Sequence, residues 1–444
     1  MITKRLSQVA WRRFVDHNAC PWGELEEFPG LPADQQRRVL AERLLSQIRY
    51  FGARQDALPE WREAACIRDC EELWRIWPSL PIINKTLLNS RFHPDELRTR
   101  FHLTGIEKST GGSTGEPTHF FHDTPAVRAS NASTLYAYQQ MGWRPGMTLI
   151  SVWGSERDIG KQTSRSVRAM NRVRRVFTVG GYNLNQDTVD TVLRLIRKHH
   201  PVAIYGFTSM LDFVARRIVE MGAAPPPGMV HTSWNGGEML FETQIAAFRK
   251  AFGVPILNLY GGRELSAMAY QNKPNGPLIV LRPWLFLEVV DDDGRPAPPG
   301  ASGRLLWTST ICRGTPFLRY EIGDLGDFDT DHQNESGITA LREVQGRTAG
   351  LLSFPNGKRV NCIYWNHLFK EMPEVCQFQV IMRQDDTLQI LLKGKGFTPE
   401  REVELRKTLQ AFVGNIGLEI TWVDRIPLTP QGKLVQVVNR KCSS

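Results

Sequence analysis

The feature of this sequence that most constrains its fold is an alternation of strand-like and helix-like segments across residues 100–260. Short runs rich in β-branched and aromatic residues predict strands at MTLISVW, RVFTVG, PVAIYGF and GMVHTSWNGG. Longer runs between them, NQDTVDTVLRLIRKHH and TSMLDFVARRIVEMG, have helical spacing, and the first opens on an Asn or Asp cap. Strands that alternate with helices predict an α/β layered core with a substantially parallel sheet.

The regions on either side of this core differ from it. Residues 1–100 are expected to be mainly helical, as in the amphipathic run LPADQQRRVLAERLLSQIRYF. Residues 277–325 hold two strand-like runs around a polar Gly/Pro turn, which predicts a β-rich subdomain. The last part of the chain reads as a hairpin, a helix and a strand. We therefore predict a large N-terminal domain over 1–346 and a small α+β domain over 347–444.

Composition excludes some classes of protein. The chain has 444 residues, of which 41% are hydrophobic and 23% charged, as is ordinary for a soluble globular protein. No apolar run is as long as a membrane span, and no apolar segment follows the basic N-terminus, so we expect neither a membrane partner nor a secretory signal. Seven scattered cysteines fit a reducing cytoplasm, and the one close pair, Cys66 and Cys70, is a weak zinc signal.

The positive charge of the chain is densest in one stretch. The net charge is +9, and Lys161–Phe177 contains six basic residues and no acidic one. On a helix, Arg168, Arg172 and Arg175 would share a face. That face would be solvated, or it would contact a phosphorylated ligand such as coenzyme A. Nucleic acid is not expected as a partner, because no stacking aromatic residues are interleaved there and no recognised motif is present.

The stretch STGGSTGEPTHF, Ser109–Phe120, gathers glycines and hydroxyl side chains in one loop. Such a loop can direct several N–H groups and hydroxyls at one anion, or it can be a simple surface turn. It is not a P-loop of the G-x-x-x-x-G-K-[ST] kind, because no lysine and hydroxyl follow Gly115.

Several stretches in order then fit one pattern. They are LPIINK (80–85), TGGSTGEP (110–117), NGGE (235–238), YGGRE (260–264), PFLRYEIGD (316–324), GR (346–347) and IPLTPQGKLVQVVNR near the C-terminus. Together they resemble the motifs of the acyl-adenylate-forming superfamily, within it the branch of phenylacetate–coenzyme A ligases and capsule-biosynthesis relatives. The resemblance covers roughly residues 75–440 and implies a mobile C-terminal domain.

The resemblance implies ATP-dependent, AMP-forming activation of a carboxylic acid as an acyl adenylate, with transfer to the thiol of coenzyme A. Three tryptophans near the core, Trp143, Trp153 and Trp234, leave room for an aromatic or medium acyl acid. An amine, a hydroxyl or a carrier-protein thiol stays open as the acceptor. A non-catalytic nucleotide-binding scaffold is disfavoured. The identity of the acid and the oligomeric state, a homodimer included, stay open.

The resemblance also assigns site residues. The phosphate loop would comprise Ser109, Thr110, Gly111, Gly112, Ser113, Thr114 and Gly115. The nucleotide pocket would comprise Gly236, Gly237, Glu238, Tyr260 and Gly261, with the Tyr260 ring against the adenine. Asp324 would hold the ribose hydroxyls, and Arg347 would assist at the ribose or phosphate. Glu264 would bind Mg²⁺, and Lys433, on the mobile domain, would stabilise charge during adenylation. Retention of Glu264, Asp324 and Lys433 together is what argues for an enzyme.

Some positions depart from the superfamily pattern. Arg263 stands where the superfamily usually carries a threonine or serine that contacts the α-phosphate. We expect its guanidinium to take over that contact with a charge-assisted hydrogen bond. Glu116 replaces a lysine often found before the loop's proline, and Ala349 and Gly350 replace the usual acidic residues of the hinge. Because the usual hinge acids are missing, the acceptor of the acyl group stays open.

Overall fold

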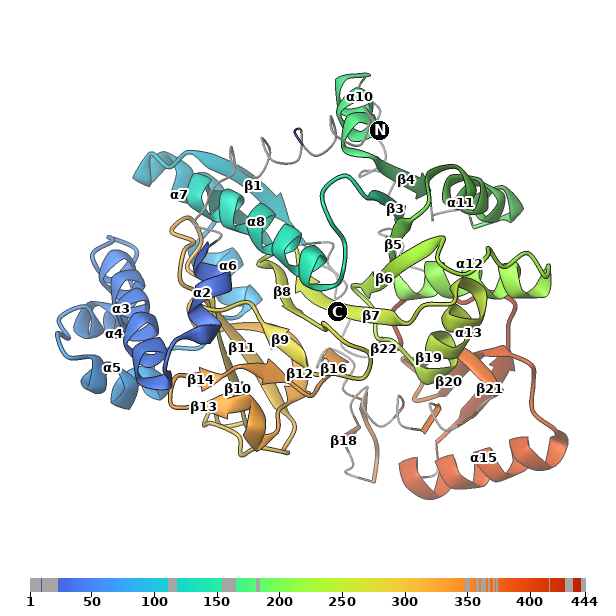
Figure 1. The fold of residues 1–444 in the computed structure, drawn as a ribbon. Helices are drawn as coiled ribbons and strands as arrows, with labels where there is room; N and C mark the ends of the chain where they lie inside the picture. The colour runs from blue at the N-terminus through green and yellow to red at the C-terminus, as the bar shows by residue number, and fades with distance from the viewer. Residues whose placement is uncertain are drawn as a thin grey trace.

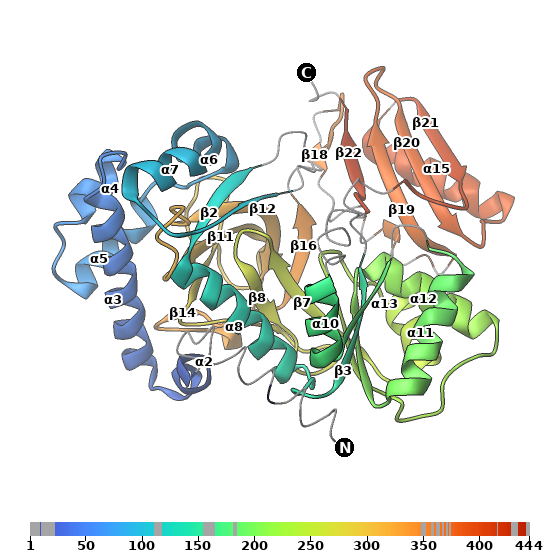
Figure 2. The ribbon, with the colours of Figure 1, turned by 90° about the horizontal axis from the view of Figure 1, so that it is seen from above.

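The computed structural model comprises a large N-terminal α/β domain and a small C-terminal α+β domain (Figure 1). It describes Val9 and residues 23–440, except 111–117, 154–164, 181–183, 348–351, 357–358, 361–364, 366–367, 370–371, 373, 415 and 428–433. The small domain packs against one side of the large one, beside helices α12 (Thr208–Glu220) and α13 (Glu242–Phe252) (Figure 2). The predicted fold class is thus confirmed, whereas the boundary at 346/347 stays a prediction.

An eight-stranded sheet of order β15-β9-β8-β7-β6-β5-β3-β4 forms the centre of the large domain. Its strands are β3 Thr148–Trp153, β4 Val176–Gly180, β5 Val202–Gly206, β6 Val230–Gly236, β7 Ile256–Gly262, β8 Ser266–Tyr270, β9 Leu278–Val280 and β15 Ala340–Leu341. The strands from β7 to β4 are parallel, and β8, β9 and β15 are antiparallel to their neighbours. Each of the predicted core strands is present, and the substantially parallel sheet is confirmed.

Helices cover both faces of this sheet. One face packs against α11 (Gln186–His199), α12 (Thr208–Glu220) and α13 (Glu242–Phe252), whose apolar sides join β3, β5 and β6 in one buried cluster. The other face packs against α8 (Thr124–Gln140), with the rings of Tyr136 and Tyr270 6.2 Å apart. The predicted cap of α11 is present, because the Asn185 side chain accepts a hydrogen bond from the Thr188 N–H at 3.1 Å.

The basic stretch forms helix α10, Arg165–Arg174, but not with the predicted face. Arg175 lies after the helix and has a φ of 62°, a left-handed conformation that turns the chain into β4. Its Nε donates a hydrogen bond to the Thr148 hydroxyl at 3.0 Å, at the start of β3. The expectation that Arg175 shares a helical face with Arg168 and Arg172 was therefore wrong. Arg172 is exposed on the helix.

The N-terminal region is helical, as predicted. Its helices are α2 Gly23–Glu27, α3 Ala33–Gly52, α4 Pro59–Ala64, α5 Cys70–Ile76, α6 Lys85–Arg91 and α7 Pro94–Phe101. The predicted β-rich subdomain is an antiparallel sheet of β10 Leu285–Val290, β11 Gly303–Ser309, β12 Tyr320–Asp327 and β16 Glu343–Arg347. Short hairpins and turns, such as β13 Gln333–Asn334 and β14 Gly337–Ile338, complete it.

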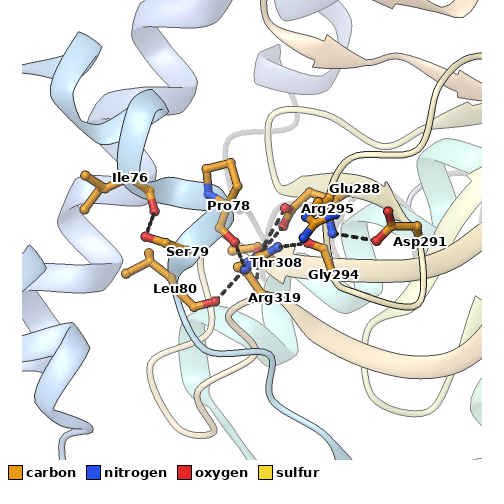
Figure 3. A network of polar contacts seen from close by, with 10 residues as sticks. All are labelled: Ile76, Pro78, Ser79, Leu80, Glu288, Asp291, Gly294, Arg295, Thr308 and Arg319. Atoms are coloured by element: carbon orange, nitrogen blue, oxygen red, sulfur yellow. Dashed lines mark hydrogen bonds and ion pairs between the residues drawn. The ribbon is translucent and has the colours of Figure 1, made fainter.

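A buried arginine joins these two regions (Figure 3). Arg319 is 2% exposed, and its Nε lies 3.2 Å from a Glu288 carboxylate oxygen. Its Nη1 donates to the carbonyls of Pro78 and Leu80, and its Nη2 to the carbonyl of Gly294. Removing one partner of such a buried pair typically costs about 3–5 kcal/mol. Arg319 therefore fixes the segment before α6 onto the β-rich sheet.

The LPIINK segment is held beside the start of β12 by backbone hydrogen bonds. The Ile83 N–H donates to the Arg319 carbonyl at 3.2 Å, and the Glu321 N–H donates to the Ile83 carbonyl at 2.8 Å. Ile83 and Tyr320 form a parallel bridge. Because β12 also carries Asp324, this motif and the predicted ribose-binding motif belong to one rigid unit.

The small domain contains the predicted hairpin, helix and strand. Its sheet has the order β21-β20-β19-β22, with β19 Val375–Met382, β20 Leu388–Gly394, β21 Leu418–Trp422 and β22 Val437–Asn439. Helix α15, Pro399–Val413, covers the sheet through Leu405 and Leu409, and β17 Leu352–Ser353 pairs with β18 Arg359–Val360 nearby. Within the described ranges, no helix of either domain combines the length and apolarity needed to cross a membrane.

Candidate active site

Several predicted nucleotide-binding residues meet at the carboxyl ends of β6 and β7. Gly236 is the last residue of β6 and the register partner of Leu259, the residue before Tyr260 in β7. In sheets of this kind, ligands bind outside the carboxyl ends of the strands. The fold thus brings two separate motifs, NGGE and YGGRE, to one edge.

The backbone at this edge favours glycine. A Cβ added to Gly236 would lie 3.1 Å from a ring carbon of Tyr205, and Gly237 has a φ of 75°. Side chains at these positions would clash or strain the chain. The glycines therefore keep the backbone accessible at the end of β6.

Tyr260, Asp324 and Arg347 lie next to one another. The Tyr260 hydroxyl donates a hydrogen bond to Asp324 Oδ2 at 2.7 Å, and the Tyr260 ring lies beside Trp307 with centroids 5.9 Å apart. Asp324 on β12 is the register partner of Arg347 on β16, of which the backbone alone is described. The structure thus groups the three residues that the resemblance assigned to the adenine, to the ribose, and to the ribose or phosphate.

The predicted phosphate loop connects the strands of a hairpin, β1 (Gly105–Ser109) and β2 (His119–Asp123). At its base the Thr110 N–H donates to the Thr118 carbonyl, and the Thr118 N–H donates to the Thr110 hydroxyl, both at 2.9 Å. Among the described residues, the buried Thr118 hydroxyl has no hydrogen-bond partner. Thr118 itself is buried, so the base of the loop is packed into the protein.

Some predicted site residues lie outside the described residues. They are Gly111, Gly112, Ser113, Thr114, Gly115 and Lys433. Their predicted roles at the phosphates stay predictions.

Arg263 connects the loop base to the YGGRE segment. The exposed Arg263 side chain donates from Nη1 to the Ser109 carbonyl at 3.1 Å. It therefore lies against the start of the predicted phosphate loop, and the contact with the α-phosphate itself stays a prediction.

Glu264 is a buried carboxylate that accepts a hydrogen bond from the Tyr320 side chain. The residue is 4% exposed, and its Oε1 accepts from the Tyr320 hydroxyl at 3.2 Å. A carboxylate has about four lone-pair positions, so further ligands can bind. Across the described ranges, no group of three or more His, Cys, Asp or Glu residues could hold a metal by itself. A single carboxylate completed by substrate phosphates is a usual arrangement for Mg²⁺, so Glu264 fits that ion.

Sequence reasoning missed Lys108 and His122, which support Glu264. The His122 ring is 2% exposed and its Nε2 donates to the Glu264 carbonyl at 2.6 Å, so its Nδ1 accepts from Lys108 Nζ at 3.1 Å. Burial, with a smaller effect of the Lys108 charge, lowers the pKa of His122 to about 3. Burial also lowers the pKa of Lys108, and the nearby Arg263 adds to this. A neutral His122 thus joins the hairpin to the backbone of Glu264.

The three tryptophans noted in the sequence surround one aromatic cluster beside Gly236. Trp234 packs on Tyr138 with centroids 4.7 Å apart, and Trp153 stacks on Tyr205 at 5.0 Å. Trp143 lies against Tyr138 at 6.4 Å. Because the Tyr205 ring contacts Gly236, the cluster borders the nucleotide edge.

The site and fold agree with one class of protein. The family model for AMP-binding enzymes matches residues 110–312, which span the phosphate loop, β6 and β7. The chain is similar to the acyl-adenylate-forming AMP-binding enzymes, and it is an adenylating enzyme that resembles the carboxylate–coenzyme A ligases.

Two relatives are similar to the chain over most of its length. Protein CapK of Staphylococcus aureus is 23% identical over 370 residues, 81% of this chain and 79% of that protein. Phenylacetate-coenzyme A ligase of Thermus thermophilus is 25% identical over 413 residues, 89% of this chain and 86% of that protein.

A solved structure, 2-hydroxyisobutyryl-CoA ligase in the postadenylation state with 2-HIB-AMP, has a TM-score of 0.67 at 17% identity. The comparison covers 92% of this chain and 90% of that one, and it supports the fold. The same ligase in its thioesterification state has a TM-score of 0.56.

Proposed function

We propose that this protein uses ATP to convert a carboxylic acid into an acyl adenylate, releasing pyrophosphate, and then transfers the acyl group to the thiol of coenzyme A, releasing AMP. The observation that carries the proposal is the grouping of Tyr260, Asp324 and Arg347 at the carboxyl ends of β6 and β7. The similarity to a phenylacetate–coenzyme A ligase supports the same reaction class.

The nucleotide would bind across this edge of the sheet. The adenine would lie against the Tyr260 ring, and the ribose hydroxyls would donate to Asp324, which Tyr260 orients through its hydroxyl. The phosphates would lie in the loop between β1 and β2, with the Thr118 hydroxyl and Arg263 at its base. Mg²⁺ on Glu264 would neutralise part of the triphosphate charge.

Adenylation then needs one substrate carboxylate oxygen in line with the α-phosphorus. The oxygen forms a bond to phosphorus as the bond to pyrophosphate breaks, and negative charge gathers on the α-phosphate oxygens. Positioning and preorganised positive charge supply most of the catalysis in such a step. Arg263, next to Glu264, and Lys433, brought in by the small domain, would supply that charge.

The aromatic cluster favours an aromatic or medium acyl acid. Trp234, Tyr205 and Tyr138 pack together beside Gly236, so the acyl group of an adenylate bound at this edge would lie near aromatic side chains. Apolar walls with a few polar groups are typical of such ligand sites.

The way in which the small domain packs on the large one supports a state of the protein that precedes acyl transfer. The TM-score against the postadenylation state of 2-hydroxyisobutyryl-CoA ligase, 0.67, exceeds that against its thioesterification state, 0.56. We therefore propose that the docked small domain belongs to the part of the cycle that precedes thioesterification.

A different acceptor is the second candidate. Arg175, expected to help bind coenzyme A phosphates, contacts the sheet instead, which weakens the sequence-based case for coenzyme A. An amine, a hydroxyl or a carrier-protein thiol would then take the acyl group.

Pyrophosphate release across a panel of aromatic and aliphatic acids, with and without coenzyme A, tests both candidates. The proposal expects acid-dependent release and a thioester product. Acid-dependent release without any thioester would favour the second candidate, and the absence of release with every acid would refute adenylation.

A further inference from the structure

The carboxylate of Glu238 bridges the two domains. Its Oε2 accepts from the Ser209 N–H at 2.7 Å, and its Oε1 accepts from the Ser209 hydroxyl at 3.0 Å. Oε1 also accepts from the backbone N–H of Leu434 at 2.9 Å, from the small domain. Ser209 belongs to the first turn of α12, so one side chain holds a helix of the large domain and a strand-forming segment of the small one.

The large domain fixes Glu238 by contacts of its own. Its backbone carbonyl accepts from Asn235 Nδ2 at 3.0 Å and from the Thr208 hydroxyl at 3.2 Å, just after β6 ends. The first turn of a helix carries unsatisfied N–H groups and partial positive charge, which favour a carboxylate there. The carboxylate is therefore preorganised for Leu434 before the small domain docks.

Leu434 directly follows Lys433 in the chain. The Leu434 N–H and the Lys433 carbonyl belong to one planar peptide group, and neighbouring Cα atoms are about 3.8 Å apart. A hydrogen bond that fixes this N–H thus restricts the position from which the lysine side chain starts.

A second contact at this interface is apolar, and electrostatic interactions of Asp212 with Lys393 and of Arg216 with Cys376 also link α12 to the small domain. Phe241, three residues after Glu238, meets Phe378 of β19 edge-on with centroids 6.4 Å apart. A crevice opens beside them, lined by Phe241, Thr243, Phe369, Val375, Cys376 and Phe378. Domain interfaces with limited apolar contact separate more readily than continuous ones, and a charge-assisted hydrogen bond adds directional specificity to docking.

We propose that Glu238 is a positioning residue for adenylation: it latches Leu434 so that Lys433 is presented to the α-phosphate, and it releases Leu434 before acyl transfer. The inference rests on the proposed function, because it assigns the lysine to the first half-reaction. The carboxylate of Glu238 accepts from Ser209 and Leu434, so the role proposed here takes the place of the predicted role of its side chain in the nucleotide pocket.

The test uses the full-length Glu238→Gln variant, which keeps the shape of the side chain and loses one acceptor oxygen. We expect the kcat of ATP–pyrophosphate exchange to fall about ten- to hundred-fold, the effect of one charge-assisted hydrogen bond. The KM for ATP should stay within about twofold, and transfer from a supplied acyl adenylate should be unchanged or faster.

Two control variants separate positioning from a structural defect. Ser209→Ala removes one contact of Glu238 and leaves the Leu434 contact, so exchange should stay within about twofold of wild type. In a Lys433→Ala background, Glu238→Gln should add no further loss, because the two residues act on one step.

A distance measurement tests the latch without catalysis. Spin labels on p-acetylphenylalanine, introduced at the exposed Lys250 of α13 and Lys407 of α15, report the separation of the domains. We expect Glu238→Gln to gain a population at longer distance, and Ser209→Ala to match wild type. Identical distributions in wild type and Glu238→Gln would overturn the latch, whether or not the protein adenylates an acid.

The kinetic outcomes are also decisive. Equal losses in exchange and in transfer, a large rise in the KM for ATP, or additive losses with Lys433→Ala would each overturn the positioning role. A wild-type protein with no exchange for any acid would refute the proposed function, and the distance measurement would then decide the latch alone.

Discussion

Replacing His122 with glutamine is expected to make the protein less sensitive to acid. In the folded protein the His122 Nε2–H donates to the Glu264 carbonyl, and burial lowers the pKa of His122 to about 3, from 6.5 for an exposed histidine. Below pH 6.5 the unfolded chain binds a proton at this position and the folded protein does not. The stabilisation contributed by His122 is therefore fully present above pH 6.5, and it is lost as the pH falls from 6.5 towards 3.

The size of the effect follows from this difference in pKa. Each pH unit between the two pKa values costs about 1.4 kcal/mol, so the His122 contribution at pH 5 is about 2 kcal/mol lower than at pH 8. Glutamine does not titrate, and its amide can still donate to the Glu264 carbonyl. Between pH 8 and pH 5, we therefore expect the unfolding free energy of wild type to fall by about 2 kcal/mol more than that of His122→Gln.

Urea unfolding followed by tryptophan fluorescence at several pH values from 8 to 5 measures this difference. The midpoint and slope at each pH give the free energy of unfolding of each protein. His119→Gln is the matched control, because His119 is partly exposed on the same hairpin. A wild-type minus His122→Gln difference that is constant from pH 8 to pH 5 would refute the reasoning, as would a His122 NMR resonance that titrates near pH 6.5.

Three further substitutions test the proposed chemistry. Lys433→Ala should abolish ATP–pyrophosphate exchange and leave transfer from a supplied acyl adenylate, because the lysine acts only while the small domain is docked. Arg263→Ala and Arg263→Thr should both lower adenylation about ten- to hundred-fold, since each removes a charged contact beside the phosphate loop. Changing Arg168 and Arg172 together to alanine should raise the KM for coenzyme A and leave pyrophosphate exchange unchanged.

Each of these substitutions has a contradicting result. Exchange at the wild-type rate in Lys433→Ala would remove the lysine from adenylation. Wild-type rates in both Arg263 variants would leave that arginine without a role at the phosphate. An unchanged KM for coenzyme A would favour an amine or hydroxyl acceptor, and Arg194→Ala, exposed on α11, controls for a general loss of positive charge.

The elements that the sequence predicted well are those governed by local pattern. The core strands from β3 to β6 and helices α11 and α12 follow from apolar periodicity, and Asn185 caps α11 as its side-chain chemistry favours. The contact between Tyr260 and Asp324 could be predicted only from the family resemblance, because 64 residues separate them in the chain.

What the sequence could not predict depends on distant backbone atoms. His122 hydrogen-bonds to a carbonyl 142 residues away, and no residue type marks such a partner in a single sequence. Glu238 binds the N–H of Leu434 across 196 residues for the same reason. Arg175 fits a helical face by spacing, but the chain adopts a left-handed conformation there to enter β4. Tertiary contacts overrode the local pattern at that residue.

The most direct test of the central claim follows the oxygen atoms of the acid. An acid active in pyrophosphate release is supplied with both carboxylate oxygens as ¹⁸O, and the AMP product is examined by mass spectrometry. If the carboxylate attacks the α-phosphorus and the acyl group is then transferred, one ¹⁸O atom must remain in the phosphate of AMP. AMP without ¹⁸O, or label in inorganic phosphate together with ADP, would contradict acyl-adenylate formation.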